Sequence, residues 1–227
     1  GPVSDPGRES YENYHSLPLR HGMTLGELAL LFNGERNIGA RLTVVPMEGW
    51  RRDLWYDQTG LAWVNPSPNL RNLTEATLYP GIGFLDWSNI SVGRGTEWPF
   101  ELVGAPWVNE QQLAEYLGLR KIAGVRFEPA NFTPTERAFA GQLCRGVRLI
   151  VTDRSALDSP LLGIEIAAAL GSLYRSDFRF GRMDDLLMHQ ATMDALMSSE
   201  DPRRIAEHWR QGLEAFRRMR QRYLLYK

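Results

Sequence analysis

The sequence predicts an α/β fold, with a mixed α+β sheet, flanking helices and a long loop-rich segment. Three observations support this prediction. Helical and strand-like apolar periodicities alternate along the chain, capping residues precede the helical stretches, and residues 48–107 show little periodicity. The length of 227 residues and the hydrophobic content of 43% suffice for one well-buried domain or for two small ones.

The predicted helices share a capping residue or a proline at their first turn. They begin after Thr24, where Glu27 completes a capping box, after Asn109, at Ser159-Pro160 and at Pro202. We expect the first helix to end near residues 33–34 and the second at Gly118. The third is expected over residues 161–173.

Three stretches alternate apolar and polar side chains, as half-buried strands do. They lie at residues 41–47, 125–132 and 147–152. The first is expected to end at Pro46, because proline lacks the N–H that a sheet ladder needs.

The last predicted helix carries one apolar stripe, with residues such as Ile205, Trp209 and Phe216 recurring every three or four positions. Its many arginines lie mostly on the opposite face. A basic amphipathic helix can bind membranes or nucleic acid, but the formal net charge of the chain is −1. We therefore interpret this face as the solvated side of a docked helix.

Residues 89–107 are rich in glycine, arginine, carboxylates and aromatic rings. Arg94 lies between two glycines, which allow positive φ or a close approach to a ligand and leave the guanidinium accessible. Two interpretations stay open from residue chemistry. In a structural loop, Arg94 would bond Glu97 or Glu101 while Trp98 and its aromatic neighbours fill a core edge; in a ligand-binding loop, the same side chains would contact a polar ring.

Six of the seven tryptophans lie within residues 48–107. Indole faces stack on sugar rings, and nearby amides and arginines can bond hydroxyl groups, although the rings could equally fill a core. Paired carboxylates in this segment could serve glycoside cleavage, but their spacing alone is weak support.

Other functional classes are disfavoured. The near-neutral charge argues against nucleic acid, and no apolar run is long enough to span a membrane. The four histidines lack metal-binding spacing, and Cys144 is the single cysteine, so we expect no metal and no cofactor. The glycine pairs at 81–83 and 93–95 lack the pattern of phosphate loops.

A series of ordered motifs resembles one known family. They lie at residues 18–24, 45–52, 66–69, 79–81, 89–96, 99–107, 144–147 and 152–154. Together they resemble the carboxy-terminal half of the exo-β-N-acetylmuramidase family typified by NamZ, long described as a domain of unknown function. Asp86 and Glu97 stand where many relatives carry different acidic motifs, which leaves the sugar preference open.

The resemblance implies a peptidoglycan glycoside hydrolase that removes N-acetylmuramic acid from non-reducing ends of cell-wall glycans. Family members combine a Rossmann-like amino-terminal domain with a second α/β domain, and the site lies in the cleft between them. Residues 1–227 would then form the single carboxy-terminal domain, whose partners are muramyl sugars and its own amino-terminal domain. The main catalytic acid would lie on that other half. The resemblance further implies a periplasmic or extracellular location.

Under this hypothesis residues 89–107 line a muramyl subsite. Arg94 is the first candidate to bind the lactyl carboxylate, because a guanidinium fork suits a planar anion, and Arg20 is the second. Glu101 would hold Arg94 in place or assist proton transfer, and His21 would orient water or a neighbouring group. The candidates for bonding sugar hydroxyls or the acetamido group are Asn69, Asn89, Ser91 and Thr96. A carbohydrate-binding or interaction domain without catalysis is the alternative.

Overall fold

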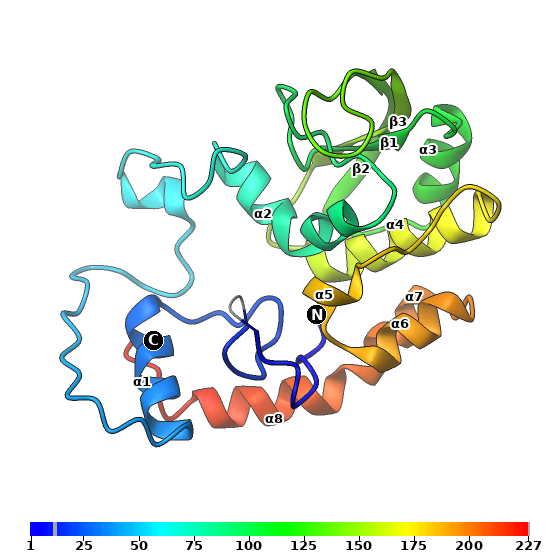
Figure 1. Cartoon of the computed structure of the whole chain (residues 1–227). Coiled ribbons are helices and arrows are strands. Elements are labelled where there is room, and N and C mark those ends of the chain that lie inside the picture. Colours follow the sequence, from blue (N-terminus) through cyan, green and yellow to red (C-terminus); the bar gives the residue numbers. More distant parts are fainter. Residues whose placement is uncertain (11–12, 227) are drawn as a thin grey trace.

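The computed structural model describes residues 1–10 and 13–226. Helices flank a small three-stranded sheet, which confirms the predicted combination of helices and sheet (Figure 1). The α-helices are α1 (Leu25–Glu35), α2 (Leu73–Ile82), α3 (Glu110–Leu119), α4 (Ser159–Leu173), α5 (Asp184–Leu187), α6 (Gln190–Met197), α7 (Pro202–His208) and α8 (Arg210–Arg220). The strands are β1 (Leu102–Ala105), β2 (Val125–Phe132) and β3 (Cys144–Val151), and the 3₁₀ turns are η1 (Tyr56–Thr59) and η2 (Gly83–Trp87).

The sheet is antiparallel throughout, with strand order β1-β3-β2. Leu102 of β1 is opposite Arg148 of β3, and Val125 of β2 is opposite Val151 of β3. The predicted strand at 125–132 is confirmed, and the strand predicted at 147–152 begins three residues earlier, at Cys144. The four buried residues of β1 give no alternation, which is why the sequence pattern did not reveal this strand.

Helix α4 contacts α2, α3, α6 and α7 (Figure 1). Asp158 caps α4 by accepting from the backbone N–H of Leu161 at 3.2 Å, whereas the predicted cap, Ser159, donates to the carbonyl of Leu78 at 2.8 Å. Two glycines permit the close crossing with α2. A Cβ at Gly81 would lie 1.7 Å from the carbonyl oxygen of Ser159, and one at Gly163 would lie 2.0 Å from that of Gly81.

Helix α1 has the predicted capping box between Thr24 and Glu27, and it ends at Glu35, within two residues of expectation. Its buried Leu31 packs with Phe216 of α8 in a second apolar cluster. The carboxylate of Glu27 is fully buried and joins distant parts of the chain. It accepts from Arg52 at 2.5 Å and from the backbone N–H of Leu225 at 2.8 Å. Burial would raise the pKa of Glu27, but these hydrogen bonds and the one from Thr24 outweigh burial and lower it.

The predicted carboxy-terminal helix is divided in two. Its apolar stripe is confirmed, because Ile205, Trp209 and Phe216 are buried. Trp209 lies between α7 and α8, so the helical stretch is interrupted where the sequence pattern continues.

Two further predictions are wrong. Residues 41–47 form no strand, and Val45 is 85% exposed. Residues 48–107 are less irregular than expected, since they contain α2, β1 and both 3₁₀ turns. Helix α2 was not predicted because it includes Pro80, and proline is disfavoured in the interior of a helix.

Candidate functional site

Residues 91–104 form a closed loop beside the sheet. Ser91 and Gly104 exchange two backbone hydrogen bonds, at 2.8 and 3.0 Å, and the N–H of Phe100 bonds the carbonyl of Val92 at 2.8 Å. Phe100 is buried and has φ of 64°, which is unusual for a residue with a large side chain. Strained backbone of this kind clusters at functional sites.

The glycines around Arg94 have the predicted positive φ, 76° at Gly93 and 74° at Gly95. A Cβ at Gly95 would lie 2.1 Å from the hydroxyl oxygen of Thr135, so this position also permits a close approach. The predicted positive φ is therefore confirmed, and the close approach of a ligand to these glycines stays a prediction.

Arg94 bonds a partner that the sequence did not indicate. Its Nε donates to Oδ2 of Asp86 at 2.7 Å, and its guanidinium lies 4.8 Å from the ring centroid of Phe100. The prediction that Arg94 bonds Glu97 or Glu101 is therefore wrong. No described residue accepts a hydrogen bond from either terminal nitrogen of Arg94. The guanidinium is thus positioned by Asp86 and Phe100, and the Arg94 side chain is 17% exposed.

Glu101 is paired with Arg148 of β3. Nη2 of Arg148 lies 3.3 Å from Oε2 of Glu101, and the same guanidinium lies 4.1 Å from the ring centroid of Trp98. Burial raises the pKa of Glu101, an effect that the charge of Glu75 reinforces and the bond to Arg148 opposes. A carboxyl group with a raised pKa next to a strained residue is a candidate for proton transfer.

Arg71 and Glu75 belong to this site but were missed in the sequence. Glu75 is fully buried and bonds both the backbone and the side chain of Arg71. Nη2 of Arg71 also donates to the carbonyls of Thr96, at 3.3 Å, and Glu97, at 2.7 Å, joining α2 to the loop. Asn72 caps α2 three residues before Glu75, and this spacing in the sequence could have predicted the start of α2.

Three side chains that were predicted to bind sugar form hydrogen bonds within the protein. Asn89 donates to the carbonyl of Asp177 at 2.8 Å and accepts from the N–H of Arg179 at 2.7 Å. Thr96 donates to the carbonyl of Gly93 at 2.6 Å, and Ser91 is buried with its hydroxyl bonded to the N–H of the same glycine. These groups hold the loop, and their contact with sugar stays a prediction.

The remaining candidates lie in two places. Asn69 bonds Glu136 at 3.4 Å, next to the Thr135 side chain that contacts Gly95, so it belongs to the surroundings of the loop. Arg20 instead bonds the carbonyl of Leu157 at 3.2 Å. His21 accepts from the N–H of Met23 at 3.2 Å and lines a separate cavity of about 420 Å³ beside α1. Burial, reinforced by the charge of Arg220, lowers the pKa of His21. No contact joins Arg20 or His21 to Arg94 in the part of the chain that the structure describes.

The tryptophans of residues 48–107 are mostly covered. Arginine guanidinium groups lie over four of the six rings, those of Trp50, Trp55, Trp87 and Trp98. Trp63 and Trp107 pack against tyrosines. Trp98, 38% exposed, is the most accessible of the six, and Arg148 covers one face of its ring.

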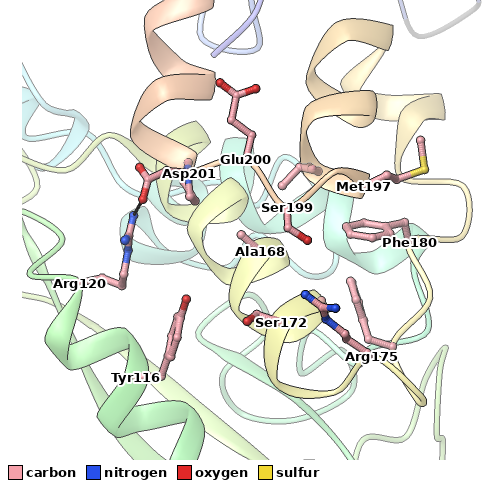
Figure 2. A pocket seen from close by; sticks show the side chains of 14 residues that line it. Tyr116, Arg120, Ala168, Ser172, Arg175, Phe180, Met197, Ser199, Glu200 and Asp201 are labelled. Carbon is pink, nitrogen blue, oxygen red and sulfur yellow. Dashed lines mark hydrogen bonds and ion pairs between the residues drawn. The ribbon is translucent and has the colours of Figure 1, made fainter.

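A further cavity of about 380 Å³ lies between α3, α4 and the turn from α6 to α7, and it contains none of the predicted ligands. Figure 2 shows Tyr116, Arg175 and Ser199 around it, with Arg120 bonded to Asp201 at 2.9 Å.

Two kinds of feature are absent from the described residues. No helix among residues 1–10 and 13–226 is long and apolar enough to cross a bilayer. Within the same residues, no group of three or more His, Cys, Asp or Glu side chains is arranged to hold a metal ion.

Known proteins resemble this chain along its whole length. The family model for the carboxy-terminal part of exo-β-N-acetylmuramidase NamZ matches residues 77–226, and the model for its amino-terminal part matches residues 1–74. The chain is 39% identical over 229 residues to the peptidoglycan β-N-acetylmuramidase NamZ of Bacillus subtilis (strain 168), covering 100% of this chain and 55% of that protein.

Two crystal structures of DUF1343 family proteins from Bacteroides fragilis NCTC 9343 have similar folds. Their TM-scores are 0.90 at 28% identity and 0.75 at 26% identity, and each match covers 100% of this chain and 62% of the solved chain. The chain therefore spans little more than half the length of its relatives. The assignment of residues 1–227 to one carboxy-terminal domain stays a prediction, and the two family models meet near residue 75. From the matched models and the identity to the B. subtilis protein, we conclude that the chain belongs to the exo-β-N-acetylmuramidase NamZ family.

Proposed function

We propose that this chain is part of a peptidoglycan glycoside hydrolase that releases N-acetylmuramic acid from the non-reducing ends of cell-wall glycans. The support is membership of the NamZ family, together with the B. subtilis relative that is a peptidoglycan β-N-acetylmuramidase. We place its action in the periplasm or outside the cell, where this polymer lies. The closed loop at residues 91–104 lines the sugar-binding cleft in this proposal.

The single observation that carries the role of the loop is the geometry of Arg94. Asp86 and Phe100 fix its guanidinium, and the terminal nitrogens have no partner among the described residues. N-acetylmuramic acid differs from N-acetylglucosamine by a lactyl ether that carries a carboxylate. A guanidinium fork binds such a planar anion through two parallel hydrogen bonds. Arg94 would therefore select the muramyl sugar.

Glu101 assists proton transfer in this proposal but does not supply the main catalytic acid. Its raised pKa favours a protonated carboxyl group that can donate. The other buried carboxylates of the site, Glu75 and Asp86, are each bonded to an arginine and so are not free to contact a substrate. The main catalytic acid then lies in the part of the relatives' length that this chain does not span.

The test uses a polypeptide with the full length of the relatives. Arg94→Lys keeps a positive charge opposite Asp86 but removes the planar fork. We expect kcat/KM for a chromogenic muramide to fall at least about tenfold relative to the matching glucosaminide, since one charged hydrogen bond contributes roughly 1.5–3 kcal/mol. Equal losses on both substrates would refute the selective role. Arg182→Lys is the matched control, because Arg182 lies over Trp87 outside the loop.

A non-catalytic carbohydrate-binding domain is the second candidate. It is favoured by the ion pairing of carboxylates that face the loop, because paired acids are poorly placed to exchange protons with a substrate. Under the first proposal the isolated chain binds muramyl sugars weakly and does not hydrolyse them, and the full-length polypeptide does. Failure of the full-length polypeptide to hydrolyse a muramide, with sugar binding retained, would establish the second candidate instead.

A further inference from the structure

The cavity between α3, α4 and the turn from α6 to α7 has an apolar wall. Ala168 and Gly171 of α4 and Leu196 of α6 contribute to it, together with Phe178 and Phe180. The two phenylalanine rings pack edge to face, with their centroids 5.0 Å apart. Gly171 permits this packing against α4, because a Cβ at this position would lie 3.2 Å from Cζ of Phe180. A ligand in the cavity would therefore contact an apolar surface that side-chain packing holds in place.

Four polar side chains on the rim of this cavity have no partner in the protein. They are Tyr116, Ser172, Arg175 and Ser199, and Figure 2 shows them around one space. Among residues 1–10 and 13–226, no group bonds the three hydroxyl groups or pairs with the guanidinium. The rim thus offers three hydroxyl groups and one positive charge to a ligand.

The acidic side chains of the cavity are paired within the protein. Asp201 accepts from Nη2 of Arg120 at 2.9 Å, and Glu200 lies 3.6 Å from Nε of Arg204. Arg175 is therefore the charged residue of the lining that lacks a counterion among the described residues. Because a free guanidinium binds anions through its planar set of donors, the cavity favours a negatively charged ligand.

Ser199 has a backbone conformation that costs stability without a compensating contact. Its φ is 62°, in the left-handed region that favours glycine. The hydroxyl of Ser199 bonds no described residue, whereas the hydroxyl of its neighbour Ser198 donates to the carbonyl of Ala195 at 3.0 Å. Strained residues of this kind cluster at binding sites. The unpartnered Ser199 side chain therefore indicates a role in binding rather than in packing.

The turn that carries Arg175 is fixed by hydrogen bonds. Arg179 donates to the carbonyl of Ser176 at 2.8 Å and to that of Phe178 at 2.9 Å. Asn89 accepts from the backbone N–H of Arg179 at 2.7 Å. The backbone next to Arg175 is thus ordered before a ligand arrives, which lowers the entropic cost of binding.

We propose that this cavity binds a small carboxylate that carries a short apolar group, as the carboxy-terminal end of a peptide does. The carboxylate bonds Arg175 and the hydroxyl groups of the rim, and the apolar group contacts the wall formed by Ala168 and Phe180. One free positive charge matches a monoanion, whereas a phosphate dianion would keep an uncompensated charge. The volume of about 380 Å³ suits a small molecule. All lining residues lie within 116–202, inside the range that the carboxy-terminal family model matches.

A titration followed by nuclear magnetic resonance tests the proposal on this chain. The probe is N-acetylalanine, and N-acetylalaninamide has the same apolar group without the charge. We expect N-acetylalanine to shift the amide signals of residues 168–175 and 199 saturably. Its Kd should be at least about tenfold lower than that of the amide, because the amide makes no charged hydrogen bond. Absence of saturable shifts, or equal Kd values for the two probes, would overturn the proposal. Inorganic phosphate that binds as tightly as N-acetylalanine would overturn it too, since phosphate makes no apolar contact.

Three variants locate the binding site. Arg175→Gln should raise the Kd of N-acetylalanine at least about tenfold. Arg218→Gln is the matched control, because it removes the same charge from an exposed arginine of α8 without a described partner, and the Kd should not change. Ser199→Gly should raise the Kd about twofold to tenfold while it stabilises the fold, a combination that a packing role would not produce. Equal effects of the two arginine changes, or full binding by Ser199→Gly, would contradict the proposal.

A last comparison distinguishes two sources of the carboxylate. One source is a peptide attached to a wall glycan, which rests on the proposed function, and the other is a free small molecule. A lower Kd for N-acetylmuramyl-alanine than for N-acetylalanine would support the first source, and equal values would support the second. Binding is measured without turnover, so failure of the proposed hydrolase would leave the test of the cavity intact.

Discussion

Arg148 lies over Trp98, with its guanidinium carbon 4.1 Å from the ring centroid. The same guanidinium reaches Glu101, so one side chain of β3 holds two residues of the loop. This arrangement covers one face of Trp98, the most exposed tryptophan of the segment, so a ligand could stack only on the other face. It also means that Arg148 keeps one partner when the other is changed.

The stability of the protein should depend on pH through Glu101. The pKa of this carboxyl group is raised above its ordinary value of 4.5, chiefly by burial. The unfolded chain therefore loses this proton at lower pH than the folded protein, and the free energy of unfolding falls as pH rises from 4.5 towards the folded pKa. Glu101→Gln should remove this contribution. Urea unfolding of both proteins between about pH 4 and about pH 7 checks the prediction, and parallel pH dependences would contradict it.

Arg120 should contribute strongly to stability. It bonds Glu165, whose side chain is 2% exposed, at 2.7 and 3.0 Å. Arg120→Met leaves that carboxylate buried with only Arg203 nearby, at 3.9 Å, and should lower the free energy of unfolding by about 3 kcal/mol. Denaturant unfolding measures the loss. Adding Glu165→Gln should recover most of it, and a double variant as unstable as the single one would refute the explanation.

Two helical glycines should respond in opposite directions to alanine. Gly81→Ala forces α2 away from α4, because the new Cβ would lie 1.7 Å from the carbonyl oxygen of Ser159, and should cost about 2 kcal/mol or more. Gly118, near the end of α3, faces open space, and a Cβ added there would meet no atom within 4 Å. Gly118→Ala should therefore stabilise by roughly 1 kcal/mol. Thermal unfolding of the pair gives the comparison. Similar unfolding midpoints for the two variants would contradict the prediction, because they would mean that α2 and α4 can move apart at little cost.

Replacement of Ser199 by glycine should stabilise the folded protein. Ser199 has φ of 62° two residues after the end of α6, where the N–H of Glu200 donates to the carbonyl of Ala195 at 2.9 Å. Glycine adopts this conformation without a steric cost, so Ser199→Gly should stabilise by about 0.5–1 kcal/mol. Ser198→Gly is the control and should destabilise, since Ser198 has φ of −83° and its hydroxyl bonds Ala195. The prediction fails if both changes shift the unfolding midpoint in the same direction.

Local signals predicted the parts of the fold that depend on local chemistry. The capping box at Thr24, the cap at Asn109 and the alternation over 125–132 are all confirmed. The strand expected at 41–47 failed for a nonlocal reason, because a strand needs a pairing partner and no described segment forms β pairs with it. Strand β1 was missed because it is buried on both faces.

The backbone conformation of the loop around Arg94 was predicted, but its ion pairs were not. Glycines around Arg94 indicated the backbone conformation, which depends on neighbours in sequence. The partners Asp86 for Arg94 and Arg148 for Glu101 depend on how the loop folds back on η2 and β3, and no spacing rule encodes that. Tertiary packing decided which acid meets which arginine.

The bond from the N–H of Leu225 to Glu27 joins residues 198 positions apart. During synthesis, Glu27 emerges long before its partner exists, so its carboxylate cannot accept this bond until Leu225 has also been synthesised. Contacts between such distant residues form late, because closing a long loop costs entropy before the contact compensates. The pairing of β2 with β3, which spans far fewer residues, can form earlier. We expect truncation of the last residues to leave the sheet intact and α1 undocked.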